Sequence, residues 1–319
     1  MSKTILITGG AGFIGSHLCD ELIRNGYNVR ILDNLSPQVH GQSSRSLARP
    51  KPPSYLNQKA EFIYGDVRDK KILKKALKGA DAVYHLAASV GVGQSMYEIE
   101  MYTSNNNLGT AILLEQLIEN PVECLIAASS MSIYGEGLYM SEGGKLYSGA
   151  KRSIRQLQAG KWELHDRQGK ILKPLPTPEK KKPVLSSVYA LSKYDQELLC
   201  LMTAQAYNFR AVALRFFNVY GTRQALSNPY TGVLAIFGSR YLNNKPPLIF
   251  EDGRQMRDFV SVYDIARACR LALEKPEASG QAINIGSGSP VTILEVAEKM
   301  ASVLGKENLK PELRGKYRV

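Results

Sequence analysis

The stretch Thr4-Ile5-Leu6-Ile7-Thr8-Gly9-Gly10-Ala11-Gly12-Phe13-Ile14-Gly15 joins a short apolar run to a glycine-rich turn. The run is typical of a strand buried on both faces. Residues 16–25 predict a helix that ends at Gly26, and residues 29–32 predict a second strand that ends at Asp33. The glycines let backbone N–H groups approach a pyrophosphate, while Asp33 can accept hydrogen bonds from an adenosine ribose. Because a 2′-phosphate would face this carboxylate, the pattern predicts NAD rather than NADP.

Strand-like and helix-like segments alternate through most of the remaining chain. This alternation predicts an α/β fold, a Rossmann-like doubly wound parallel sheet of about seven strands with a smaller C-terminal substrate-binding domain. We expect an NAD-binding domain over residues 1–217. Residues 218–319 are expected to be mainly substrate-binding, with strand and helix returns to the first domain. Residues 36–57 show no clear period and predict a long loop, and residues 136–185 form a basic insert.

Residues at the ends of predicted strands are candidates for cofactor contacts, since ligands of open α/β sheets bind at the carboxyl ends. Asp66 and Val67 offer a carboxylate and an amide to adenine, although Asp66 could instead cap a helix over residues 70–77. Small residues end the strand at residues 82–88, where a cofactor would pass. His85 in that strand is more typical of a structural hydrogen-bonding residue than of a catalyst.

Tyr189 and Lys193 are four residues apart on a predicted helix and therefore share one face. A free phenol has a pKa near ~10, too high for a base in a cell. An ammonium roughly 5 Å away, at an effective dielectric of about 20, would lower the phenol pKa by about 2 units and make it a usable base. The alternative interpretation is an exposed lysine beside a packed ring.

A strand predicted over residues 124–128 delivers three serines to the carboxyl edge of the sheet: Ser129, Ser130 and Ser132. One of these hydroxyls can point at a substrate. Alternatively, all three satisfy loop backbone groups.

The net charge of +12 arises mainly in one segment. Residues 145–182 hold eleven Lys and Arg against three Asp and Glu, with only Tyr147 and Trp162 as aromatic residues among them, so we predict no nucleic-acid binding. No run of about 18 apolar residues predicts a membrane span, and the N-terminus shows no signal-peptide layout. The cysteines form neither a metal spacing nor a disulfide framework: Cys19, Cys124, Cys200 and Cys269. We therefore expect buried thiols, no bound metal and a cytoplasmic protein.

Together these residues resemble the extended short-chain dehydrogenase/reductase family, and within it the nucleotide-sugar epimerases and dehydratases. The resemblance covers most of the chain, from the glycine turn to Arg257-Asp258-Phe259-Val260. It implies an enzyme that binds NAD through Gly9, Gly12, Phe13, Ile14, Gly15, Asp33, Asn34, Asp66, Val67, Leu86, Ala87, Ala88, Asn106, Tyr189 and Lys193.

The same resemblance implies the roles of the reacting residues. Tyr189 would deprotonate a sugar hydroxyl while NAD takes hydride from the carbon that carries it. Ser130 would donate a hydrogen bond to the reacting oxygen. Lys193 would hold the nicotinamide ribose and lower the Tyr189 pKa. A nucleotide-diphosphate sugar would be held by Ser130, Ser132, Asn218, Arg257 and Arg318.

The residues after Ser130 distinguish between subclasses. The family's 4,6-dehydratases carry Asp then Glu there, and its decarboxylases also carry a Glu, whereas this chain has Met131 and Ser132. Epimerisation, at C4, is therefore the leading interpretation. The alternatives are an NAD-dependent nucleotide-sugar dehydratase or oxidoreductase and, more remotely, a non-catalytic sensor of NAD or nucleotide sugar.

Two regions depart from the family pattern. The insert resembles one found in dTDP-L-rhamnose 4-epimerases but lacks Cys-x-x-Cys, which again predicts no zinc, and Lys180-Lys181-Lys182 predicts a solvated tip. We expect the insert to cover the sugar pocket or to add a partner surface. The chain also stops at Val319, where family members usually continue, which suggests truncation. Apolar stripes on the helices beginning near Asn106 and Tyr189 predict a homodimer.

Overall fold

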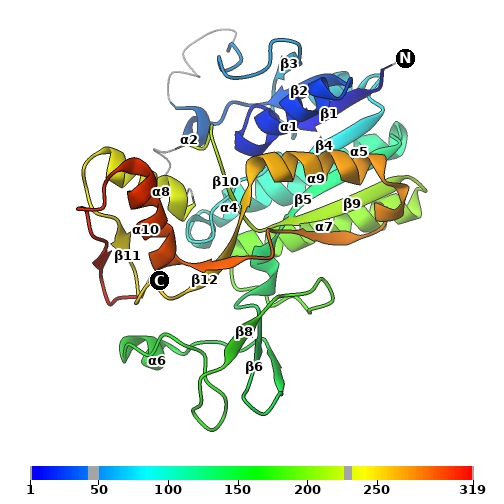
Figure 1. Cartoon of the computed structure of the whole chain (residues 1–319). Helices are drawn as coiled ribbons and strands as arrows, with labels where there is room; N and C mark the ends of the chain where they lie inside the picture. Colours follow the sequence, from blue (N-terminus) through cyan, green and yellow to red (C-terminus); the bar gives the residue numbers. More distant parts are fainter. Residues whose placement is uncertain (1, 42–49, 226–231, 318–319) are drawn as a thin grey trace.

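A single parallel sheet of seven strands forms the centre of the structure, a computed structural model that describes residues 2–41, 50–225 and 232–317 (Figure 1). The strand order is β13-β9-β5-β4-β1-β2-β3. These strands are β1 (Thr4–Thr8), β2 (Asn28–Asp33), β3 (Glu61–Tyr64), β4 (Ala82–His85), β5 (Cys124–Ser130), β9 (Arg210–Phe216) and β13 (Ala282–Ile285). The predicted Rossmann-like sheet of about seven strands is thereby confirmed.

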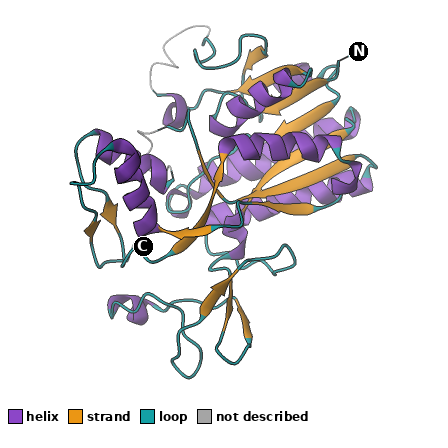
Figure 2. Cartoon of the chain, in the orientation of Figure 1, coloured by secondary structure: helices purple, strands orange, loops and turns teal. Residues whose placement is uncertain are grey.

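Helices cover both faces of the sheet, which explains why its strands read as continuous apolar runs (Figure 2). One face carries α1 (Phe13–Arg24) and α9 (Val262–Glu274), which pack against each other. The other face carries α3 (Lys70–Leu77), α5 (Gly109–Glu119) and α7 (Val188–Ala206). The sheet is thus enclosed between two apolar cores, and its carboxyl edge is left for the site.

Short helical turns lead into this edge. The helix α4 (Ile99–Tyr102) runs into a π-helical turn, η3 (Thr103–Leu108), which continues directly as α5. The 3₁₀ turns are η2 (Gln94–Met96), η4 (Met131–Tyr134) and η5 (Pro276–Ala278). Local π-helical geometry of this kind often occurs at functional sites, and η3 packs against α7 here.

A smaller C-terminal lobe lies beside the sheet and has its own core, built around Phe237 and Tyr241 (Figure 1). Its strand β12 pairs in parallel with β10 and antiparallel with β14. Thr292 and Glu295 cap its last helix with a reciprocal capping box. The elements of the lobe are β10 (Asn218–Tyr220), α8 (Val233–Leu242), β11 (Leu248–Ile249), β12 (Met256–Ser261), β14 (Pro290–Thr292), α10 (Ile293–Leu304) and β15 (Glu312–Leu313). The division at residue 217 stays a prediction.

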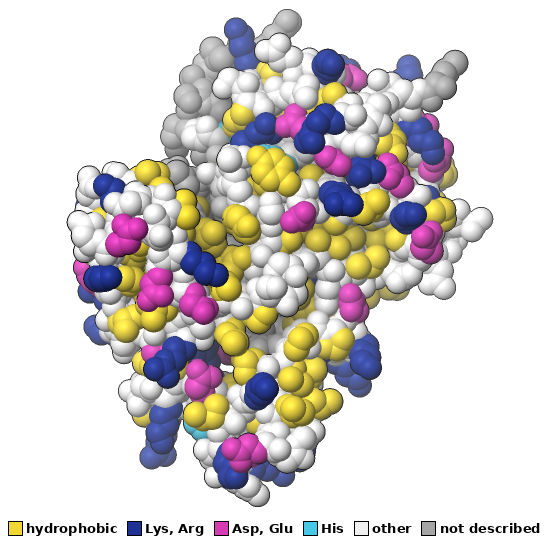
Figure 3. Space-filling model, viewed as in Figure 1, with side chains coloured by type: hydrophobic (Ala, Val, Ile, Leu, Met, Phe, Trp, Pro, Cys, Tyr) yellow, Lys and Arg dark blue, Asp and Glu magenta, His cyan; other side chains and the backbone are white. Residues whose placement is uncertain are grey.

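The insert, residues 136–185, projects from the sheet as a separate lobe (Figures 1 and 3). Three of its segments form a small antiparallel sheet in the order β7-β6-β8. Both basic and hydrophobic side chains lie on its surface in the view of Figure 3. The elements of the insert are β6 (Leu138–Met140), β7 (Leu146–Ser148), α6 (Ile154–Gln158) and β8 (Lys173–Leu175).

Two local predictions are wrong. Residues 36–57 are not loop throughout, because Pro37 starts a short helix, α2 (Pro37–His40). The lysine triplet is not a solvated tip, because Lys181 is 6% exposed while Lys180 and Lys182 point to solvent. Within the described residues, no helix combines the length and apolar character needed to cross a membrane.

Candidate functional site

The glycine turn after β1 leaves no space for side chains at two positions. A Cβ on Gly9 would lie 2.7 Å from the backbone nitrogen of Ala87, and a Cβ on Gly15 would lie 2.5 Å from the carbonyl oxygen of Gly9. Gly9 also has a φ of +70°, which disfavours other residues. The turn therefore brings the N-terminus of α1, with Gly12, Phe13 and Ile14, against the sheet edge. This is the geometry that a dinucleotide pyrophosphate needs.

Asp33 lies at the end of β2 and faces the same turn. Its carboxylate accepts hydrogen bonds from the backbone N–H groups of Ala11 and Leu35, each at 2.9 Å. The His40 Nε2 lies 3.8 Å from it. Burial raises the pKa of Asp33, while these partners oppose the rise. A buried carboxylate held at this position can accept ribose hydroxyls, so the residues present fit an NAD cofactor.

Asp66 does not cap α3, contrary to one interpretation of the sequence. Asp69 does so, by accepting from the backbone N–H groups of Lys71 and Ile72. Asp66 instead accepts from Arg68 and from the Asn34 amide. Burial opposes its ionisation, but these hydrogen bonds outweigh burial and hold the Asp66 pKa at about 2. The carboxylate and the following Val67 lie beside the end of β2.

Asn106 is fully buried in the π-helical turn and connects three segments. Its Oδ1 accepts from the backbone N–H of Ser89 at 2.7 Å, and its Nδ2 donates to Ser192 Oγ at 2.9 Å. These bonds position the residues that follow β4, Leu86-Ala87-Ala88, against α7. The predicted cofactor role of Asn106 stays a prediction, and its structural role is evident.

His85 has the structural character that the sequence suggested. Its Nδ1 lies 2.8 Å from Thr8 Oγ1 and its Nε2 lies 2.9 Å from Thr110 Oγ1. Burial, assisted by the nearby Lys193 charge, lowers the His85 pKa to about 3. The imidazole, with a hydrogen-bond partner on each ring nitrogen, links β1, β4 and α5 as part of the packing.

Ser130, Tyr189 and Lys193 meet at the carboxyl edge of the sheet. Ser130 and Tyr189 are both buried, and the Ser130 side chain lies close enough to the phenol to lower its pKa. Lys193 is 3% exposed and donates from Nζ to the Ala128 carbonyl oxygen at 3.0 Å. The Tyr189 ring is held edge-on against Tyr102. The sequence-predicted triad is therefore brought together by β5 and α7.

The pKa of Tyr189 differs from the sequence expectation. Burial raises it, and the Ser130 side chain offsets part of the rise. Burial also lowers the Lys193 pKa to about 8. Both groups are desolvated, and the ammonium is engaged by a backbone carbonyl, so Lys193 alone does not bring the phenol pKa towards neutrality. A base at Tyr189 needs a further positive charge.

Two of the predicted substrate residues, Asn218 and Arg257, lie on β10 and β12, and Asn218 Nδ2 contacts Met131 Sδ, next to Ser130, at 3.6 Å. Asn218 donates from Nδ2 to the Asp258 carbonyl oxygen at 2.8 Å, and Arg257 is exposed on β12. Among the residues that the structure describes, Ser132 Oγ is a buried hydroxyl without a hydrogen-bond partner. Such a hydroxyl is available to a polar ligand. Arg318 lies outside the described residues.

Sequence reasoning missed a buried ion pair beside this site. Arg215 donates from Nε to Glu197 Oε2 at 2.9 Å, and both side chains are almost fully buried. The available signal was a charged residue inside the otherwise apolar run of β9, because a buried charge requires a partner.

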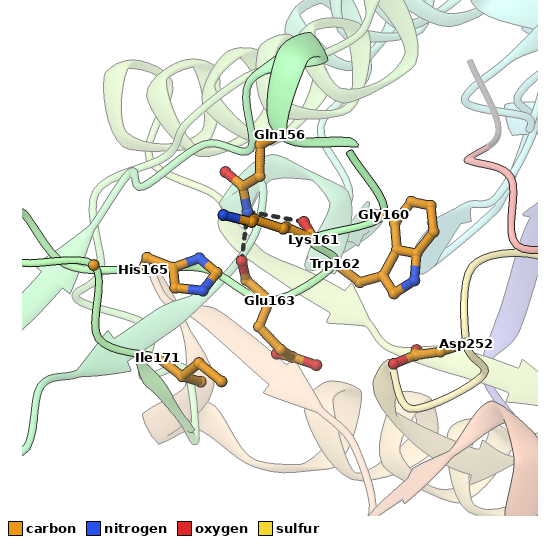
Figure 4. Close-up of a pocket in the computed structure, with 9 residues that line it drawn as sticks. Gln156, Gly160, Lys161, Trp162, Glu163, His165, Ile171 and Asp252 are labelled. Atoms are coloured by element: carbon orange, nitrogen blue, oxygen red, sulfur yellow. Dashed lines mark hydrogen bonds between the residues drawn. The ribbon is translucent and has the colours of Figure 1, made fainter. Parts of the chain in front are cut away.

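A separate hollow of about 490 Å³ lies where the insert meets the C-terminal lobe (Figure 4). Trp162 and Glu163 line it from the insert, and Asp252 lines it from the lobe. The Gln156 amide donates to the carbonyl oxygens of Lys161 and Glu163 and holds this turn. The hollow contains none of the predicted site residues.

Comparisons with known proteins agree with this geometry. A family model described as the NAD dependent epimerase/dehydratase family matches residues 5–286. The dTDP-L-rhamnose 4-epimerase of Burkholderia thailandensis is 33% identical over 320 residues, covering 99% of this chain and 85% of that protein. The UDP-N-acetyl-alpha-D-glucosaminuronate decarboxylase of Bacillus cytotoxicus is 32% identical over 301 residues, covering 93% and 79%. The crystal structure of the UDP-glucose 4-epimerase of Thermus thermophilus in complex with NAD matches with a TM-score of 0.73 and 31% identity, covering 98% of this chain and 85% of that one.

Proposed function

The chain belongs to the NAD-dependent epimerase/dehydratase family, and we propose that it inverts C4 of a sugar carried on a nucleoside diphosphate. It is an NAD-dependent enzyme of the epimerase type. The observation that carries the proposal is the meeting of three buried side chains, Ser130, Tyr189 and Lys193, at the carboxyl edge of the sheet, where Lys193 donates to the Ala128 carbonyl oxygen.

The roles of the chain's own residues follow from this arrangement. Tyr189 takes the proton from the sugar hydroxyl and later returns it, while Ser130 holds the reacting oxygen. Lys193, which the Ala128 carbonyl oxygen holds, would bond a ribose hydroxyl of the cofactor. When bound, NAD supplies a reversible hydride acceptor and a positive charge near the phenol, so that the sugar can pass through a ketone at C4. That positive charge would lower the Tyr189 pKa, which burial has raised, so that the phenol can act as a base.

The segment after Ser130 favours epimerisation over elimination or decarboxylation. Met131 and Ser132 occupy the positions at which the resemblance places acidic side chains in the family's dehydratases and decarboxylases. An NAD-dependent nucleotide-sugar dehydratase or oxidoreductase remains the alternative, and a non-catalytic NAD or nucleotide-sugar sensor is the remote one.

The substrate site is proposed between β5 and the C-terminal lobe. Arg257 projects from β12 with no carboxylate partner among the described residues, so its guanidinium is available to a diphosphate. Asn218 and the unpartnered Ser132 hydroxyl add polar contacts. Arg318 completes the proposed set. The insert joins this side through Arg152, which contacts both Glu136 and Glu251, and we propose that it covers the sugar pocket.

We also propose a cytoplasmic homodimer. The four cysteines are buried free thiols, as expected in a reducing compartment. Leu191, Leu198 and Met202 form an exposed apolar stripe on α7 at helical spacing. A second copy of this chain, with α7 packed against α7, would cover it. In this proposal, residues 1–217 bind NAD, and residues 218–319 mainly bind the substrate.

The test is a product assay that does not presume the sugar. Purified protein is incubated without added cofactor with UDP-, dTDP-, GDP- and CDP-sugars, beginning with dTDP-L-rhamnose and UDP-glucose, and the products are analysed by NMR. An equal-mass product inverted at C4, without net NADH, is expected. Loss of water or carbon dioxide, or accumulation of NADH, would move the assignment to the alternatives, and no turnover on any sugar would favour the sensor.

A further inference from the structure

The last part of the insert contacts the segment that carries Ser130. We call residues 177–181 the return arm. Lys181, at its end, donates from Nζ to the Tyr134 carbonyl oxygen at 2.8 Å and lies over the Tyr134 ring. Three residues later, the Val184 N–H donates to the Ile133 carbonyl oxygen at 2.8 Å. The return arm is therefore bonded to the 3₁₀ turn η4, which starts directly after Ser130.

Lys181 is buried without a carboxylate partner among the described residues. It is 6% exposed, and burial lowers its pKa. Within the described residues, no carboxylate forms a salt bridge with it, and its hydrogen-bond acceptors are two backbone carbonyls. Burying an ammonium costs free energy. The hydrogen bond from Lys181 Nζ to the Tyr134 carbonyl oxygen offsets part of this cost.

Arg215 holds the same tyrosine through its hydroxyl group. Its Nη1 donates to Tyr134 Oη at 2.6 Å and to the Glu179 carbonyl oxygen in the return arm at 2.9 Å. Its partner Glu197 accepts from Ser129 Oγ at 2.6 Å. The residue before Ser130 and the residue four positions after it are thus both tied to one buried ion pair.

Asn284, on β13, completes the network. It accepts from Tyr134 Oη at 2.8 Å and donates from Nδ2 to the Thr177 carbonyl oxygen at 2.9 Å. Its backbone N–H donates to Glu179 Oε1 at 3.0 Å. The sheet, the return arm and η4 are consequently locked together through Tyr134.

From this network we infer that Lys181 is a positioning residue, through which the insert holds Tyr134 and keeps Ser130 beside Tyr189. The inference rests on the proposed catalytic roles of Ser130 and Tyr189. It makes the insert part of the active-site framework rather than only a cover. Since the Ser130 side chain lowers the Tyr189 pKa, loosening η4 should raise that pKa.

The chain supplies matched controls for the test, because Lys180 and Lys182 flank Lys181 and are exposed. We would compare Lys181→Met with Lys180→Met and Lys182→Met. Lys181→Met is expected to lower kcat at least tenfold with KM changed less than threefold. It should also move the rising limb of the pH–kcat profile to higher pH, which a purely structural defect would not do. The controls are expected to match the wild type.

A second readout does not depend on turnover. Hydrogen exchange at the Val184 amide should accelerate at least tenfold in Lys181→Met and stay unchanged in the controls. If Lys181→Met does not fold, Lys181→Gln replaces it, because the polar glutamine side chain is one atom too short to reach the Tyr134 carbonyl oxygen as the ammonium does. Wild-type kinetics or wild-type exchange in the test variant would overturn the inference. If the wild-type protein were inactive on every nucleotide sugar, the proposed function would fail, whereas the exchange result would still decide whether Lys181 holds η4.

Discussion

The Lys193 ammonium lies 3.0 Å from the Ala128 carbonyl oxygen and donates to it, joining the N-terminal half of α7 to the carboxyl end of β5. This contact fixes the cation beside Tyr189 but removes it from water, and burial lowers its pKa from 10.5 to about 8. Burial of Lys193 therefore lowers the free energy of unfolding by an amount that depends on pH.

Comparison with Lys193→Met, which has no ammonium to bury, should reveal this pH dependence. Between about pH 8 and pH 10.5 the unfolded chain holds a proton that the folded protein has released, so the free energy of unfolding of the wild type should rise with pH relative to Lys193→Met. The relative slope should approach about 1.4 kcal/mol per pH unit within this range. Chemical denaturation of both proteins from pH 7.5 to 9.5 measures it. Parallel stability curves would contradict the shifted pKa.

Tyr189→Phe should remove the base and leave the packing. The ring keeps its edge-on contact with Tyr102, so the melting temperature and bound NAD should stay close to wild type. The loss in kcat should be on the order of 10²- to 10⁴-fold, as for other general bases. Tyr194→Phe, on the same helix, is the control and should keep full activity. Substantial turnover by Tyr189→Phe would assign the proton transfer to another group.

Arg257→Ala should weaken substrate binding. The side chain is exposed and donates to the adjacent Met256 carbonyl oxygen, so folding should be unaffected. Loss of a charge-assisted bond to the diphosphate costs about 1.5–3 kcal/mol, which should raise KM by roughly ten- to hundredfold with a smaller effect on kcat. Steady-state kinetics beside Arg254→Ala, a nearby exposed arginine, checks this. Equal KM values for the two variants would remove Arg257 from the site.

Gly15→Ala should abolish tight binding of NAD. The added methyl group would lie 2.5 Å from the Gly9 carbonyl oxygen and 2.6 Å from the Gly10 Cα, both of which are backbone atoms. The turn must shift, and we expect binding about hundredfold weaker, or about 2.7 kcal/mol. Calorimetric titration with NAD measures the affinity. Gly143→Ala, where no atom lies within 4 Å of the added Cβ, should bind like the wild type. Unchanged binding by Gly15→Ala would argue against a cofactor at this turn.

The apolar stripe on α7 predicts the oligomeric state. The double variant Leu198→Glu, Met202→Glu places two charges on it and should convert a dimer into monomers, measured by light scattering after gel filtration. Val303→Glu on α10 is the control, because Val303 is also exposed, at 86%, but lies on another helix. A monomeric wild type, or a dimer that survives the double variant, would exclude this interface.

Local patterns determined much of the fold. The β1–turn–α1–β2 unit was predictable because its signals, an apolar run, a glycine turn and a terminal Asp33, lie within one short stretch. The capping box of Thr292 and Glu295 is likewise a three-residue relationship. The spacing of Tyr189 and Lys193 placed both on one helix face, and a strand earlier in the chain supplied Ser130.

Tertiary structure alone decided which of these groups lose contact with water and what they then contact. Lys181 resembles its two neighbours in sequence, yet only Lys181 is buried, because the return arm folds back onto Tyr134. The Tyr189 pKa moved opposite to the sequence expectation, because desolvation depends on every segment packed around the phenol. Sequence spacing thus determined the elements and the candidate residues, whereas burial and long-range hydrogen bonds, which join residues far apart in the chain, determined their electrostatics.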